Sequence, residues 1–199
     1  MKSIDVKGTA RTATGKKATR EIRNNGCIPC NLYGEKRGEN GLPVATNFTV
    51  TAAEVRNLVY SPDIYSVNLS IDGEEHIAVM KELQFHPVTD QLLHIDFYEV
   101  TPEKPIVMEV PIKLNGLAEG VKAGGKLAAS VRKLKVRAPY THIPEKLNID
   151  VTNLGLGKTI KVGELNFEGL ELVTSPSVVV CQVKMTRSAI SAMATAAKK

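Results

Sequence analysis

Residues 64–85 read IYSVNLSIDGEEHIAVMKELQF and carry the clearest structural signal in this chain. The first half alternates, so that Tyr65, Val67, Leu69 and Ile71 share one face of a strand. Asp72-Gly73 is a residue pair that two-residue hairpin turns prefer. A return strand follows from about residue 75 to 84, and its two predicted faces are Ile77, Val79, Leu83 and Phe85 on one side and Glu82, Gln84 and His86 on the other. The pattern predicts an antiparallel hairpin.

Segments on both sides of the hairpin continue the β pattern. Strands are predicted over residues 3–9, 28–33, 42–48 and 91–100, and in the last of these apolar residues alternate with His94, Asp96 and Tyr98. Two glycines, at positions 15 and 26, bound a short helix over residues 16–24, and a capping box at Thr51 opens a second helix to about Val59. Residues 1–100 are therefore expected to form a small, mainly β domain with short helices.

A segment with two prolines, residues 101–105, marks a predicted domain boundary. Beyond it, strands over 106–114, 131–138, 147–151 and 178–185 predict an all-β second domain spanning residues 101–185. The glycine-rich GVKAGG, residues 120–125, lacks the preceding strand and following helix of a dinucleotide site, so a tight turn is predicted there. Residues 186–199 are small and polar and are expected to form a flexible tail.

Positive charge is concentrated at the start of the chain. Residues 1–37 hold nine Lys/Arg against three Asp/Glu, whereas residues 38–199 hold seventeen against eighteen. We therefore expect the first domain to meet an anionic partner such as nucleic acid, and no broad phosphate interface on the second domain. No apolar run approaches the ~20 residues that cross a bilayer. The first residues lack the apolar segment of a signal peptide, so we expect a cytoplasmic protein with no membrane partner.

The densest run of cations is RTATGKKATREIR, residues 11–23. Its basic residues are Arg11, Lys16, Lys17, Arg20 and Arg23. On the predicted helix, Lys16, Arg20 and Arg23 share one face, whereas Ala18 and Ile22 lie on the opposite face. Such a helix can pack by one side and present cations to phosphates from the other. A merely solvated charged face is the alternative.

Cys27 and Cys30 form a C-x-P-C motif, which could be a redox pair or half of a zinc site. A redox pair of the thioredoxin kind would precede a helix, but here a helix precedes the motif and a strand follows it. On a strand, residues three apart face opposite sides, and only His86 and His94 could complete a metal site. We expect Cys30 and Cys181 to be core residues and expect no metal or cofactor, with a thiol- or metal-dependent protein as the alternative.

Polar side chains lie opposite the apolar faces of the predicted strands. They are Tyr33, Gln84, His86, His94 and Asp96. A phenol, an amide, two imidazoles and a carboxylate suit the reading of base edges and stacking on bases. The same set would suit acid–base catalysis, but no nucleophile signature, phosphate loop or H-E-x-x-H motif accompanies it. We expect no enzymatic activity.

Several of these motifs, taken together, resemble a known family. They are RTATGKKATREIR at 11–23, IPCNLYG at 28–34, His86-Pro87 and HIDF at 94–97. In this order they are similar to the bacterial ribosomal protein L-twenty-five family. Val110-Pro111, Ile143-Pro144 and Asp150-Val151 resemble the second domain of that family's long, two-domain form, the general stress protein Ctc. The resemblance covers about residues 2–185.

The resemblance implies a small N-terminal β-barrel, similar to the anticodon-binding domain of glutaminyl-tRNA synthetase, and a C-terminal β domain. It implies binding to the loop E region of 5S ribosomal RNA, in the central protuberance of the large subunit, with other rRNA and neighbouring ribosomal proteins as partners and no small-molecule substrate. The RNA-contacting positions it implies are Arg11, Lys16, Arg20, Tyr33, Gln84, His86, His94 and Asp96, and the basic stretch adds Lys17 and Arg23. The chain departs from the family at Cys30-Asn31, where apolar residues are more common. A stress-related module acting through the second domain is a further alternative.

Overall fold

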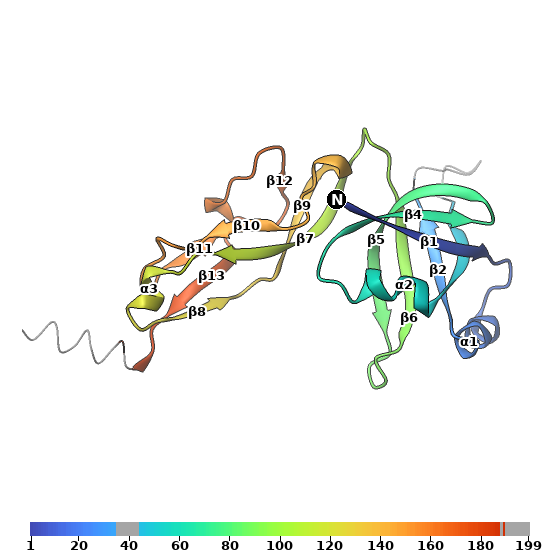
Figure 1. The fold of residues 1–199 in the computed structure, drawn as a ribbon, viewed down its shortest axis with the longest axis horizontal. Helices are drawn as coiled ribbons and strands as arrows, with labels where there is room; N and C mark the ends of the chain where they lie inside the picture. The colour runs from blue at the N-terminus through green and yellow to red at the C-terminus, as the bar shows by residue number, and fades with distance from the viewer. Residues whose placement is uncertain (35–43, 188, 190–199) are drawn as a thin grey trace, which may run out of the picture. The chain divides into compact units, whose positions relative to one another are not determined.

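The computed structural model describes residues 1–34, 44–187 and 189. Its contacts divide the chain into two compact units. The first comprises Met1–Ile106 with Pro139–Thr141, and the second Val107–Ala138 with His142–Lys199. Strands dominate both units (Figure 1), as the sequence predicts. The domain limits at residues 100 and 185 stay predictions.

Six strands of the first unit close into a barrel in the order β1-β3-β2-β6-β5-β4, which confirms the predicted barrel. Their bounds are β1 Lys2–Ala10, β2 Cys27–Tyr33, β3 Thr46–Thr51, β4 Tyr65–Ile71, β5 Glu74–Phe85 and β6 Leu92–Glu99. Two helices, α1 (Lys16–Asn24) and α2 (Ala52–Val59), accompany the strands. The strand predicted over 42–48 begins only at Thr46, and its first two residues lie outside the described part of the chain.

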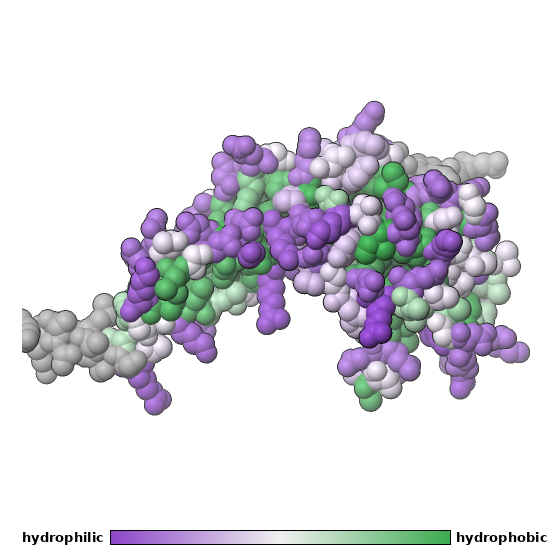
Figure 2. All heavy atoms as spheres, in the orientation of Figure 1, coloured by the Kyte–Doolittle hydropathy of each residue, from purple (hydrophilic) through white to green (hydrophobic). Residues whose placement is uncertain are grey.

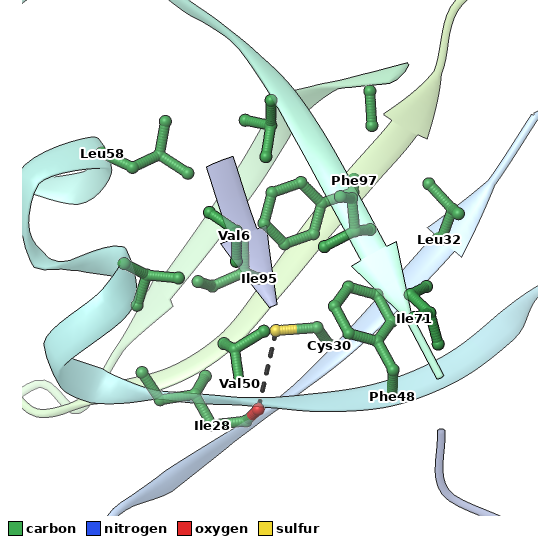
Figure 3. Close-up of a cluster of buried hydrophobic side chains, with 14 residues drawn as sticks. Val6, Ile28, Cys30, Leu32, Phe48, Val50, Leu58, Ile71, Ile95 and Phe97 are labelled. Atoms are coloured by element: carbon green, nitrogen blue, oxygen red, sulfur yellow. Dashed lines mark hydrogen bonds between the residues drawn. The ribbon is translucent and has the colours of Figure 1, made fainter. Parts of the chain in front are cut away.

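Alternate residues of the strands fill the barrel. Phe48 and Phe97 are fully buried, and their ring centroids lie 5.7 Å apart. Figure 3 shows Cys30 within this cluster, where its Sγ contacts the carbonyl oxygen of Ile28 at 3.6 Å. The prediction that Cys30 is a core residue is therefore confirmed, and Cys181 is likewise fully buried in the second unit.

The predicted hairpin turn between β4 and β5 is confirmed. Asp72 has φ 49° and Gly73 has φ 95°, as a type I′ turn requires of both central residues. Asp72 also accepts a hydrogen bond from the backbone N–H of Ala10 at 3.2 Å. Val67, Leu69 and Ile71 of β4 all enter the core, as their alternation predicts.

A bulge in β5 was not apparent from the sequence. The pairing with β6 shifts register between Met80 and Glu82, which leaves Lys81 as an extra residue. The predicted apolar face of this strand comprises Ile77, Val79, Leu83 and Phe85. That prediction is wrong, because one extra residue exchanges the inward and outward positions halfway along the strand.

Exposure shows the effect of the bulge. Before it, Ala78 enters the core, whereas Ile77 is 43% exposed. After it, Leu83 packs against the core and pairs with Ile95, and its neighbour Gln84 faces outward. Phe85, beyond a second register shift, is 40% exposed. The bulge thus places Gln84 on the outer surface of the barrel.

The second unit contains two sheets. The larger sheet has the strand order β10-β7-β9-β12, with bounds β7 Pro105–Asn115, β9 Lys133–Pro139, β10 Leu147–Asp150 and β12 Glu171–Leu172. The smaller sheet has the order β11-β13-β8, with bounds β8 Lys126–Ala129, β11 Thr159–Lys161 and β13 Val179–Lys184. The 3-10 turn η2 (Val162–Glu164) belongs to this unit, whereas the first two residues of η1 (Tyr140–His142) belong to the first unit. The four predicted strands correspond to β7, β9, β10 and β13. The other three strands have only two to four residues, too few for a periodic pattern.

Two further predictions concern the second unit. The tight turn predicted at 120–125 is wrong in part, because Glu119–Lys122 forms one turn of helix, α3, before the chain reverses. The flexible tail predicted for 186–199 lies mostly outside the described residues. At its start, the Thr186 hydroxyl donates to the carbonyl oxygen of Gly124 at 2.6 Å. No helix within the described ranges is long and apolar enough to cross a membrane.

Candidate nucleic-acid interface

Three neighbouring strands present a continuous polar surface on the outside of the barrel. β2 pairs with β6 in parallel, so that Asn31 lies beside Asp96, and β5 pairs with β6 antiparallel, so that Gln84 lies beside His94. We call this surface the polar face and define it as Asn31, Tyr33, Glu82, Gln84, His94, Asp96 and Tyr98. The structure thus brings four sequence-predicted residues from three strands into one place.

Asp96 and His94 form the centre of the polar face. The Nδ1–H of His94 donates to the Asp96 carboxylate at 2.9 Å. Burial lowers the pKa of His94, and the nearby cations Arg11 and Arg23 lower it further, while Asp96 opposes them. His94 is therefore neutral at neutral pH. With its proton on Nδ1, it offers Nε2 as an acceptor.

Tyr33 extends this surface along β2. Its ring meets that of Tyr98 edge-on, with centroids 5.7 Å apart and an interplanar angle of 70°. Burial raises the pKa of Tyr33, and the neighbouring acidic groups of Asp96 and Glu82 add to the effect. The phenol therefore keeps its proton and can donate a hydrogen bond, and the ring offers a surface for stacking.

Arg11 belongs with the strands rather than with the helix cations. Its Nη2 donates to the side-chain oxygen of Asn31 at 3.5 Å, at the edge of the polar face. Its Nε is buried and has no hydrogen-bond partner among the described residues. A guanidinium held in place at a surface in this way is suited to an anionic oxygen through its terminal Nη groups.

The exposure of the side chains of helix α1 agrees with the helical-wheel prediction. Ala18 and Ile22 are half-buried, whereas Lys16, Lys17 and Arg20 are exposed. Gly15, the residue before the helix, has φ 96°, a conformation that suits glycine. The first turn carries two lysines and no acidic residue, although the positive end of a helix dipole disfavours cations. The local fold does not offset this repulsion, and an anion bound there would.

Arg23 and His86, two of the residues predicted to contact RNA, also make hydrogen bonds within the protein. The Nε of Arg23 donates to the carbonyl oxygen of Leu93 at 3.1 Å, which ties α1 to β6 beside His94. The Nδ1 of His86 accepts the backbone N–H groups of Val88 at 3.3 Å and Thr89 at 3.2 Å. His86 therefore organises the loop between β5 and β6, and its proton lies on Nε2.

Three members of the polar face, Asn31, Glu82 and Tyr98, were not predicted as site residues. Strand alternation places each of them on the same face as a predicted site residue two positions away, so the sequence did offer a signal for them. Their closeness to one another across strands depends on register, which no local pattern of this sequence reveals. The side-chain oxygen of Asn31 accepts the hydrogen bond that holds Arg11 in place.

The two cysteines of the C-x-P-C motif lie on the same strand, β2, but differ in their burial. Cys30 is fully buried, and burial raises the pKa of its thiol to about 12. Cys27 is partly exposed, and its Sγ contacts the carbonyl oxygen of Asn25 at 3.9 Å. His86 and His94, the candidate further ligands, are engaged in the contacts described above.

Comparison with known proteins agrees with both units. Residues 6–97 match the family model described as the Ribosomal L25p family, and residues 105–187 match the model described as the C-terminal domain of ribosomal protein TL5. A curated relative from Phocaeicola vulgatus, named large ribosomal subunit protein bL25, is 62% identical over 198 residues and covers 100% of both chains. A protein of the same name from Bacteroides thetaiotaomicron is 58% identical over 203 residues, which cover 100% of both chains. Another from Porphyromonas gingivalis is 56% identical over 190 residues, which cover 95% of this chain and 96% of the relative.

A two-unit β protein with these matches falls in the class of ribosomal proteins and is not an enzyme. More specifically, the chain belongs to the bL25 family of large ribosomal subunit proteins, in its long, two-domain form.

Proposed function

We propose that the barrel binds 5S rRNA at its loop E region and so helps to hold this RNA in the central protuberance of the large subunit. As a member of a family of large ribosomal subunit proteins, the chain is a structural constituent of the cytoplasmic ribosome. The choice of 5S rRNA follows from the resemblance of the motifs around Arg11–Arg23, residues 28–34 and residues 94–97 to the family.

The observation that carries the proposal is the polar face beside a basic helix. Asn31, His94 and Asp96 are partly buried, mutually adjacent and rich in hydrogen-bonding atoms. The wide, shallow minor groove of an RNA helix exposes base edges and 2′-hydroxyls to such a surface. On α1, Lys16 and Arg20 would neutralise phosphates and displace counterions.

The proposal divides the work between the two surfaces. The cations of α1 and Arg11 supply affinity that falls with salt, because they contact phosphates. Asp96 supplies discrimination, since a carboxylate near phosphates is repelled unless it accepts specific hydrogen bonds from its correct partner.

Gel shifts with 5S rRNA and with a tRNA competitor, repeated over a salt series, test this division. Arg20→Ala should lower the slope of log affinity against log salt by about 1. Asp96→Ala should leave the slope unchanged and weaken 5S binding by roughly 10- to 100-fold, an effect of about 1–3 kcal/mol. Failure of the wild-type chain to prefer 5S rRNA over tRNA would overturn the proposal. An unchanged slope in Arg20→Ala together with full 5S binding by Asp96→Ala would refute the division of labour.

A further inference from the structure

The second unit carries a net positive charge. The charge count above, which divides the chain at residue 37, does not show it. Between Val107 and Arg187 the sequence holds twelve Lys/Arg against seven Asp/Glu, whereas residues 38–106 hold three against eleven. Counting from residue 38 adds the acidic half of the barrel to a basic second unit, and the sum is nearly neutral. The expectation that the second domain has no broad phosphate interface rests on that sum and loses its basis.

Two lysines of the smaller sheet lie directly opposite one another. Lys126 of β8 and Lys184 of β13 are cross-strand partners, and both are exposed. Like charges in this arrangement destabilise a sheet. Within the described part of the chain, neither lysine has an acidic partner. An anion bound between them would remove the repulsion that the fold itself leaves in place.

Three more cations lie near this pair. Lys122 ends α3, four residues before Lys126. The carbonyl oxygen of Lys158 accepts the N–H of Val183 at 3.0 Å, next to Lys184. The bond from Thr186 to Gly124 brings the adjacent Arg187 to the loop after α3. We call this set of exposed residues the basic end and define it as Lys122, Lys126, Lys158, Lys184 and Arg187. Glu119, in the first turn of α3, adds one opposing charge.

Close backbone packing holds the segments of the basic end together. The N–H of Gly120 donates to the carbonyl oxygen of Leu154 at 2.9 Å, and a Cβ at Gly120 would lie 2.6 Å from the carbonyl carbon of Gly155. A Cβ at Gly125 would lie 2.5 Å from Val183 of β13. The glycine-rich segment at residues 120–125 therefore packs closely against residues 154–156 and against β13. The cations are thus mounted on a fixed backbone, and hydrophilic side chains project from this end of the unit in Figure 2.

We propose that the basic end binds the sugar-phosphate backbone of RNA, as a second contact separate from the barrel. Neutralisation of phosphates by Lys and Arg supplies most of the affinity of sequence-independent nucleic-acid binding. Lysine is depleted from protein–protein interfaces, and four of the five residues here are lysines. On the ribosome, such a contact fixes the second unit to RNA without reading sequence.

The first test measures binding of the full-length chain to large ribosomal subunits depleted of this protein, over a salt series. Lys126→Gln/Lys184→Gln should lower the slope of log affinity against log salt by about 2. The matched control is Lys135→Gln/Arg137→Gln, because these cations of β9 pair with Glu109 at 3.9 Å and Glu171 at 3.5 Å. It removes the same charge and should change the slope much less. Equal slopes for the wild type and the Lys126/Lys184 variant, or equal changes in both variants, overturn the proposal.

A second measurement identifies the chemistry of the partner. A photoactivatable cross-linker is attached to Ala123→Cys, an exposed position beside Lys122, in a Cys27→Ser background. Cross-links to RNA are expected, and cross-links to protein alone would overturn the proposal. The Lys126/Lys184 variant should still bind isolated 5S rRNA as the wild type does. If the wild-type chain fails to bind 5S rRNA but the slope still depends on Lys126 and Lys184, the proposed barrel function fails and the basic end stands.

Discussion

At the scale of single residues, His94 should make the stability of the barrel depend on pH. Burial lowers its pKa from the ordinary value of 6.5, so between these two pKa values the unfolded chain binds more protons than the folded one. Stability should therefore fall as the pH drops below about 6.5 and level off below the folded pKa. Denaturant unfolding of the wild type and His94→Gln at a series of pH values measures this. The variant should lose that part of the pH dependence.

The exposed His142 offers a matched control for this experiment. His142→Gln makes the same substitution at an exposed position, without disturbing a hydrogen bond between described residues, and its stability measured against pH is the reference for the His94 variant. If His94→Gln keeps the pH dependence of the wild type, that dependence comes from other groups, and the assignment of a neutral His94 bonded to Asp96 is incorrect.

Cysteine reactivity tests the environment of the C-x-P-C motif. Burial raises the pKa of Cys30 to about 12 and also raises that of Cys181, and thiolate is the reactive form. Native protein should therefore react at one thiol, that of the partly exposed Cys27, when titrated with a thiol reagent. All three thiols should react after unfolding. Rapid reaction of Cys30 in native protein would instead support the thiol-dependent alternative.

At the scale of secondary-structure elements, the bulge in β5 determines where the polar face lies. Deleting Lys81 removes the extra residue and leaves the β5–β6 pairs on both sides of the bulge in register, so Leu83 stays inward and Gln84 outward. We expect this variant to fold and to keep 5S binding. Deleting Leu83 instead would bring the polar residue Glu82 opposite Ile95 of the core, and the loss of one buried apolar side chain costs about 1.5–3 kcal/mol. The Leu83 deletion should therefore be less stable by at least that amount and bind 5S rRNA more weakly, as unfolding curves and gel shifts would show. Loss of folding in the Lys81 deletion would contradict the assignment of Lys81 as the extra residue.

Elements with a clear hydrophobic periodicity were predictable from the sequence, whereas features that depend on pairing with another strand were not. The alternation in β4 and β6 and the wheel of α1 follow from local sequence. The bulge at Lys81 depends on the strand that β5 pairs with, so the sequence of β5 alone does not indicate it. Four members of the polar face were predicted as site residues, but Asn31 joins them only because β2 lies parallel to β6. Sequence thus identified candidate side chains, and register determined which of them meet.

At the scale of the whole molecule, the distribution of charge follows the two units rather than the order of the sequence. The basic residues 1–37 and the acidic segment of residues 38–106 belong to the same unit, the barrel. Within the proposed RNA contact, α1 supplies cations for phosphates, and the carboxylates of the polar face supply hydrogen-bond acceptors. The second unit has its own positive surplus at the basic end. Two separate RNA contacts would bind more tightly than either alone, because the second forms at a high effective concentration.

This arrangement predicts how the chain can be divided. A fragment of residues 1–106 should be a better RNA-binding unit than one of residues 1–100, since Ile106 is buried and clusters with the first unit. It should bind isolated 5S rRNA within about threefold of the full chain, a difference of less than ~1 kcal/mol. On depleted large subunits it should bind more weakly and with a smaller salt slope, because it lacks the basic end. Circular dichroism first confirms that the fragment is folded. A folded fragment that has lost 5S binding would show that the second unit contributes directly to the 5S contact, and the separation of roles between the two units would then be wrong.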